Sequence, residues 1–84
     1  MAVAPPYTIT TMISNFLGTA PTLEEIVAFK LPDFLEERAL ELLERNRSGQ
    51  LTSEERAELD EFTRMGHFMN MVKLQARLKL AGQA

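Results

Sequence analysis

Residues 48–80 read SGQLTSEERAELDEFTRMGHFMNMVKLQARLKL, and this stretch decides the fold. Gly49 ends one helical pattern, and Thr52, followed three residues later by a glutamate, is the capping box that begins the next. Apolar residues then recur at steps of three and four as far as Leu80, which is the spacing of one helix face. The sequence therefore predicts a long helix over residues 53–80.

The helix predicted before this one is much shorter. At ~1.5 Å per residue, residues 53–80 span roughly 42 Å and residues 32–47 about 24 Å. If the two run antiparallel, the segment Met69–Leu80 projects beyond its neighbour. This segment reads MNMVKLQARLKL and is too apolar to be left in water. We expect the N-terminal region, a second copy or another protein to cover it.

The first residues form an arm with weak structural signals. Residues 1–21 carry no charged side chain and are rich in threonine, proline and small residues. The alternation over Tyr7–Thr10 predicts a short strand. The helical spacing of the apolar residues between Ile13 and Leu17 predicts a short helical segment that ends at the following glycine. We expect the arm to become ordered only against another surface.

A second capping box connects the arm to the helices. Thr22 and the glutamate three residues later begin a short helix over residues 23–29, which stops before Pro32 because the residue preceding a proline disfavours helical backbone. The predicted fold is therefore all-α: a short helix plus a long antiparallel helical hairpin with an N-terminal arm. The helices make up one domain over residues 22–84. In the first helix of the hairpin, one face is predicted to carry the apolar residues Leu35, Ala39, Leu42 and Leu43.

Length and composition exclude several classes of protein. A chain of 84 residues forms one domain at most. Cysteine is absent, so the chain has no disulfide and no thiolate metal site. The first residues lack the basic region of a signal peptide, and no apolar run is long enough to span a membrane. We expect a cytoplasmic protein.

Charge is distributed unevenly along the chain. Residues 24–61 hold all twelve acidic side chains and five basic ones, whereas residues 62–84 hold four basic side chains and no acidic one. Acids early and bases late in a helix both favour its dipole, which explains the signs within residues 53–80. The dipole explains less well why residues 62–84 hold no acid at all, and a basic end that faces a partner is the alternative explanation. Both interpretations stay open at this stage.

The long helix carries two apolar rows. The first is a seam for neighbouring helices, and it consists of Leu59, Phe62, Met69, Val72, Ala76 and Leu80. The second appears only past Phe68 and consists of Met71, Leu74 and Leu78. Gly66 interrupts the helix interior, where glycine costs up to ~1 kcal/mol relative to alanine. We interpret it as a point of close backbone approach, with a bend as the alternative.

No catalytic, cofactor-binding or metal-binding residues are predicted. His67 is the only histidine, and a helical di-metal site needs a glutamate three residues before it, where the sequence has Arg64. The carboxylates between Glu54 and Glu61 are explained by solvation and by the helix dipole. The methionines around Phe68 are explained by adaptable packing. We therefore expect a protein without enzymatic activity and without a cofactor.

Nucleic-acid binding is not favoured either. Residues 32–47 and 53–80 form a superficial helix-turn-helix pattern. Recognition helices use their N-terminal residues in the groove, but residues 54–61 hold five acidic side chains that phosphates would repel. Only the basic end is left to bind nucleic acid, and four charges on an acidic protein give weak affinity.

The stretches LLERNRSGQLTSEERAELDEF and HFMNMVKLQARLKL resemble a group of small, mostly uncharacterised bacterial proteins common in cyanobacteria. Members share a helix that ends in a glycine turn, an L-T-x-E-E-x-x-E-L-D start and an apolar helix that ends in K-x-x-A-R. The matching positions here are Leu51, Thr52, Glu54, Glu55, Glu58, Leu59, Asp60, Lys73, Ala76 and Arg77. The resemblance covers residues 23–80. Genes of this group often neighbour small nucleases, so it implies an antitoxin-like or accessory role.

These observations predict a non-catalytic protein-interaction or regulatory protein that docks through its C-terminal helix. The predicted partner is a second copy, a larger protein such as a nuclease toxin, or both. The alternatives are a self-associating structural module without a toxin partner and a weak nucleic-acid binder. The residues predicted to bind the partner or form the dimer interface are Met71, Val72, Lys73, Leu74, Arg77, Leu78 and Lys79. A homodimer is expected to bury Val72, Leu74, Ala76, Leu78 and Leu80 between the copies.

Overall fold

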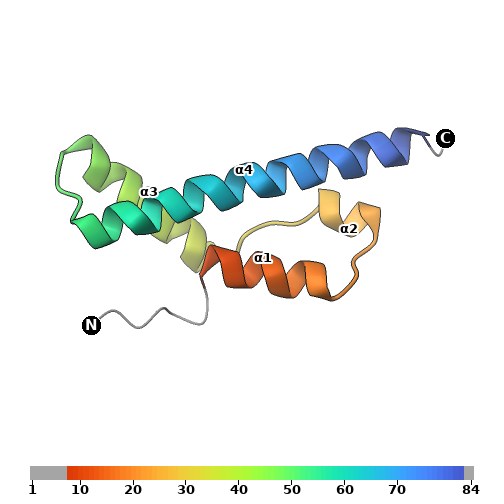
Figure 1. The fold of residues 1–84 in the computed structure, drawn as a ribbon, viewed down its shortest axis with the longest axis horizontal. Coiled ribbons are helices and arrows are strands. Elements are labelled where there is room, and N and C mark those ends of the chain that lie inside the picture. The colour runs from red at the N-terminus through yellow and green to blue at the C-terminus, as the bar shows by residue number, and fades with distance from the viewer. Residues whose placement is uncertain (1–7, 83–84) are drawn as a thin grey trace.

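The computed structural model describes residues 8–82, and one long helix forms its axis (Figure 1). In chain order the helices are α1 (Ile9–Gly18), α2 (Leu23–Val27), α3 (Asp33–Arg47) and α4 (Ser53–Gly82). No strand occurs among the described residues. The predicted all-α fold class is therefore confirmed. None of the helices within residues 8–82 is both long enough and apolar enough to cross a bilayer.

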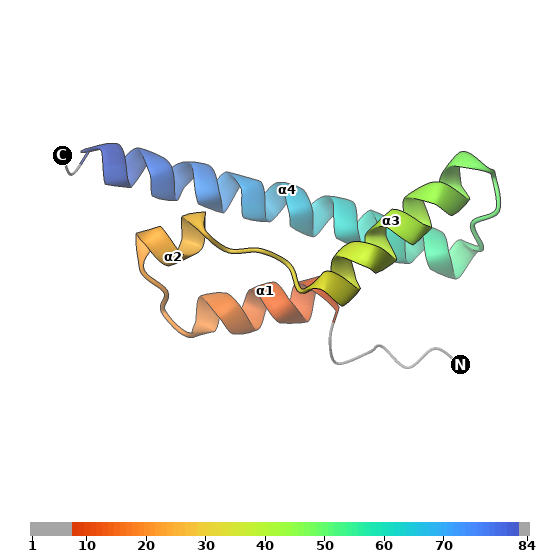
Figure 2. The ribbon, with the colours of Figure 1, turned by 180° about the vertical axis from the view of Figure 1, so that it is seen from behind.

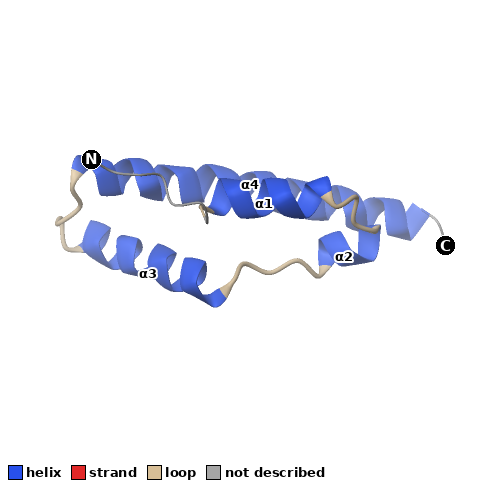
Figure 3. Ribbon diagram, turned by 90° about the horizontal axis from the view of Figure 1, so that it is seen from below, coloured by secondary structure: helices blue, strands red, loops and turns tan. Residues whose placement is uncertain are grey.

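The three shorter helices all pack on α4. Helix α3 returns along the N-terminal half of α4, whereas α1 and α2 lie beside its middle and its C-terminal half (Figures 1 and 2). Seen from below, α1 overlaps α4 and α3 lies apart from α1 (Figure 3). The molecule is elongated, with extents of 49 × 25 × 18 Å. Helix α4 is thus the element on which the rest of the fold is assembled.

Local capping fixes the turn between α3 and α4. Gly49 has a φ of +73°, and the backbone N–H groups of Gly49 and Gln50 donate to carbonyls of Asn46 and Arg45 in the last turn of α3. This is a Schellman motif, which satisfies carbonyls that the helix end leaves free. At the start of α4, the Thr52 hydroxyl accepts from the N–H of Glu55, and the Glu55 carboxylate accepts from the N–H of Thr52. The capping box read from the sequence is present.

Apolar contact and ion pairs hold α3 against α4. Leu35, Leu42 and Leu59 are buried. Arg38 donates to Glu58 at 2.8 Å, and Arg45 donates to Glu55 at 2.6 Å. These ion pairs are only partly buried and such pairs contribute about 0–1 kcal/mol each, so the buried leucines supply most of the stability of this contact.

One arginine at this contact donates hydrogen bonds to two carboxylates. Arg38 bonds both Glu58 and Glu41, which raises the pKa of Arg38 further above its usual value. The hydrogen bond from Arg38 is also the main reason that the pKa of Glu41 is lowered. Arg38 and Glu41 are therefore both charged at neutral pH.

Helix α1 differs from the strand predicted in this region. Thr8 and Ile9 do not continue a strand: the Thr8 hydroxyl accepts from the N–H of Thr11 at 3.1 Å and caps a helix. The strand prediction is therefore wrong from Thr8 onward, and Tyr7 lies outside the described residues. Ile9 and Ile13 are buried against Met69 of α4. Ile9, which belongs to the strand-like pattern in the sequence, lies on the inner face of a helix, because burial outweighs its intrinsic preference.

The inner face of the segment Met69–Leu80 is covered within the chain. Met69 is buried, Val72 packs against the cluster of Ile9, Ile13 and Met69, and Ala76 is only 2% exposed. Val72 and Ala76 were predicted to lie between two copies, but α1 and α2 of the same chain cover them. Other side chains of the segment stay exposed, among them Met71, Leu74 and Leu78.

Gly66 lies inside the continuous helix α4, and no other segment approaches it closely. A Cβ atom at this position would meet no atom within 4 Å of the described chain. The close-packing interpretation of Gly66 is therefore wrong within this chain.

We expect Gly66→Ala to stabilise the protein by about 0.5–1 kcal/mol, because alanine loses less conformational entropy in a helix interior than glycine does. The matched control is Ala57→Gly, at an exposed position of the same helix, which should destabilise by a similar amount. Urea unfolding followed by circular dichroism measures both. A loss of stability on Gly66→Ala would show that this position requires glycine.

Candidate docking surface

Four large apolar side chains in the C-terminal half of α4 are exposed. We call them the exposed α4 row: Phe68, Met71, Leu74 and Leu78. Met71, Leu74 and Leu78 are 68%, 51% and 56% exposed. Their spacing of three and four residues places them along one helix face. The second apolar row read from the sequence thus lies at the surface, where contiguous apolar side chains typically mark an interaction site.

A groove between α2 and α4 borders this row. It has a volume of about 360 Å³. Its lining residues are Leu23, Ile26, Phe68, Met71, Val72, Gln75, Ala76 and Lys79. Leu23 and Ile26 are three residues apart and half-buried, so α2 turns one apolar face toward α4. The sequence analysis did not include these two residues in the site, although their position directly after the capping box at Thr22 is a usable signal.

The predicted site residues separate into two groups. Met71, Leu74, Arg77, Leu78 and Lys79 are exposed. The remaining two belong to the interior of the chain. Val72 packs on the core, and Lys73 is half-buried.

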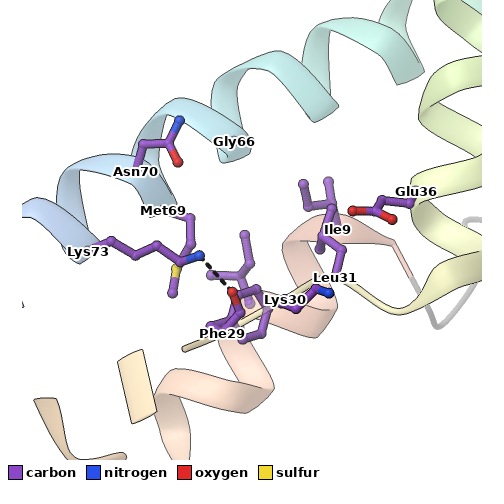
Figure 4. A pocket seen from close by; sticks show the side chains of 10 residues that line it. Ile9, Phe29, Lys30, Leu31, Glu36, Gly66, Met69, Asn70 and Lys73 are labelled. Atoms are coloured by element: carbon purple, nitrogen blue, oxygen red, sulfur yellow. Dashed lines mark hydrogen bonds between the residues drawn. The ribbon is translucent and has the colours of Figure 1, made fainter. Parts of the chain in front are cut away.

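Lys73 holds the segment between α2 and α3 in place. Its Nζ donates to the backbone carbonyl of Phe29 at 2.6 Å (Figure 4). The Phe29 ring in turn lies against Phe16 of α1, with ring centroids 4.5 Å apart. Lys73 therefore positions the segment that joins α2 to α3, and its contact with this carbonyl occupies the ammonium group that the sequence analysis assigned to a partner.

Beside Lys73 lies a second cavity of about 220 Å³. It is bounded by α1, α4 and the segment between α2 and α3, and its lining residues are Ile9, Ile13, Phe29, Lys30, Leu31, Glu36, Gly66, Met69, Asn70 and Lys73 (Figure 4). These residues include no serine, threonine or histidine that would pair a nucleophile with a base. Over residues 8–82, no three histidine, aspartate or glutamate side chains are grouped so that they could hold a metal ion.

Basic side chains border the exposed α4 row. Arg64, Arg77 and Lys79 are exposed, and none of them forms an ion pair within the described part of the chain. By contrast, Arg38 and Arg45 are both bonded to carboxylates of α4. The surface around the row is therefore apolar in the middle and positively charged at its borders.

Comparison of this chain with protein-family models, with curated proteins and with solved structures found no match.

We expect Lys73→Met to destabilise the protein by about 1 kcal/mol, because it removes the hydrogen bond to the Phe29 carbonyl. The matched control is Arg77→Met, four residues along the same helix, which should change stability by no more than about 0.5 kcal/mol. Thermal and urea unfolding of both variants test this. Equal losses for the two variants would contradict a structural role specific to Lys73.

Proposed function

We propose that this chain is a non-catalytic protein-interaction protein whose docking surface is the exposed face of the C-terminal half of α4. The observation that supports this most directly is the exposed α4 row. A small chain has little apolar surface to spare for its own core, yet Met71, Leu74 and Leu78 all stay more than half exposed. They lie beside a groove whose lining is mostly apolar.

The basic residues beside the exposed α4 row indicate the chemistry of the proposed partner. The exposed α4 row is bordered by Arg64, Arg77 and Lys79, and residues 62–82 hold no acidic side chain. A partner surface with apolar residues bordered by carboxylates complements this face. In such contacts the charges mainly set the rate of association, whereas the apolar anchors set the rate of dissociation.

A regulatory, antitoxin-like role is the finer form of the proposal. It rests on the resemblance described for residues 23–80, and in this form a larger cytoplasmic protein such as a nuclease binds the exposed α4 row. The antiparallel pair of α3 and α4 then serves as the frame that presents the row. Self-association without a toxin partner is the second candidate, favoured by the exposed Leu40 and Leu43 of α3.

Site-specific photo-crosslinking tests the proposal. A photoreactive amino acid placed at Met71 or Leu78, in cells of the source organism, should give a defined crosslinked species. The matched control position is Asn15, which is exposed on α1, and it should give none. Adding Leu74→Glu should abolish the crosslinks at both α4 positions, because a buried unpaired charge opposes docking.

The partner identified by crosslinking is then purified, and its binding to this chain is measured directly. Arg77→Glu with Lys79→Glu should slow its association by about tenfold at low salt and leave its dissociation nearly unchanged. Crosslinks equally strong at Asn15 and at Met71, or none at either, would contradict docking through α4.

A further inference from the structure

Helix α3 carries a second exposed apolar patch, and its charge is opposite to that of α4. Leu40 is 65% exposed and Leu43 is 46% exposed. The prediction that Leu43 lies on the inner face of α3 with Leu35 and Leu42 is therefore wrong, because α4 covers only the narrower face that Leu35 and Leu42 share. Three residues separate Leu40 from Leu43, so the two side chains lie on the same outer side of the helix.

Acidic side chains surround these two leucines. We call the group the α3 outer face: Asp33, Glu36, Glu37, Leu40 and Leu43. All five side chains are exposed, and Glu36 lies at the edge of the face, where it also lines the cavity beside Lys30. Asp33, Glu36 and Glu37 form no ion pair within the described residues, whereas Glu41 and Glu44 are paired with arginines of α3 itself. The carboxylates beside Leu40 are therefore available to cations from outside the chain.

We infer that the exposed α4 row of one copy packs on the α3 outer face of a second copy, and that the contact is reciprocal. This inference rests on the proposed docking function of α4 and names its occupant. Each surface combines exposed apolar residues with adjacent charges, and the charges on the two surfaces are of opposite sign. A reciprocal pair closes as a two-fold dimer, in which the same two patches are used on both copies.

Charge also argues against the simpler dimer in which two α4 rows face each other. Residues 62–82 contribute four cations and no anion from each copy. Pairing the rows directly would bring these cations together without a carboxylate between them, and juxtaposed like charges disfavour association. Packing on the α3 outer face instead places Arg77 and Lys79 near carboxylates such as Glu36 and Glu37.

A reciprocal contact also provides the buried surface area that a stable dimer needs. A stable interface buries about 800 Å² on each partner, more than four side chains of one helix provide. The reciprocal arrangement forms the contact twice, so each copy contributes both α3 and α4. The groove beside α2, with Leu23 and Ile26, extends the apolar area next to Phe68 and Met71.

Two charge-reversal variants test the inference. The first carries Arg77→Glu and Lys79→Glu, and the second carries Glu36→Lys and Glu37→Lys. Each variant alone should dimerise at least about tenfold more weakly than the unmodified protein at low salt, because its two surfaces then carry the same charge. An equimolar mixture should form the mixed dimer with an affinity within about threefold of the original, because both contacts are again complementary. Native mass spectrometry and sedimentation velocity distinguish the species.

Asn15→Glu is the control for added charge and should leave dimerisation unchanged, and circular dichroism establishes that each variant is folded. If the variant carrying Glu36→Lys and Glu37→Lys dimerised as strongly as the unmodified protein, the inference would be overturned, because α3 would then take no part in the contact. A monomeric unmodified protein at about 100 μM would overturn it too. If a photoreactive residue at Met71 then still crosslinks to another protein, docking through α4 stands and only the second copy as its partner is wrong. If no crosslink forms, both the proposed function and this inference fail.

Discussion

The structure depends on the contact that α1 and α2 make with the C-terminal half of α4. A helix of 30 residues that projected alone into water would have no tertiary packing along half of its length, and packing supplies most helix stability in proteins. Ile13 is only 1% exposed beneath Met69, and the small side chain of Ala76 is buried where α2 lies closest. Complete burial of a side chain such as isoleucine contributes about 1.5–3 kcal/mol. The chain therefore folds its own N-terminal helices back over this segment.

This contact also determines what remains at the surface. Because α1 and α2 occupy one side of α4, the seam containing Met69 and Ala76 is closed, and the exposed α4 row is left open. Residues 62–82 hold no acidic side chain, and Arg64, Arg77 and Lys79 beside the row form no ion pair within residues 8–82. Helix α3 shows the converse pattern, with carboxylates beside Leu40. The fold thus separates an apolar basic surface from an apolar acidic one, and this separation supports an interaction role.

Sequence alone predicts the parts of this fold that local chemistry determines. Caps at Thr22 and Thr52 and the glycine turn define α2, α3 and α4, because these signals act within a few residues. Helix α1 was missed over its first turn because Ile9 and its threonine neighbours prefer strands intrinsically, and only contact with distant Met69 decides otherwise. For the same reason the sequence identified the open row of the candidate site, whereas the inward position of Lys73 depends on a carbonyl 44 residues earlier in the chain.

Isotope-filtered NMR on an equimolar mixture of labelled and unlabelled protein tests the central claim most directly, because it separates contacts within a copy from contacts between copies. The contact to measure joins the Ile13 methyl groups and the Met69 methyl group. The account predicts a strong nuclear Overhauser effect between them within one copy, unchanged on dilution. Observation of this effect only between labelled and unlabelled copies would contradict it, because α1 would then cover the α4 helix of a partner.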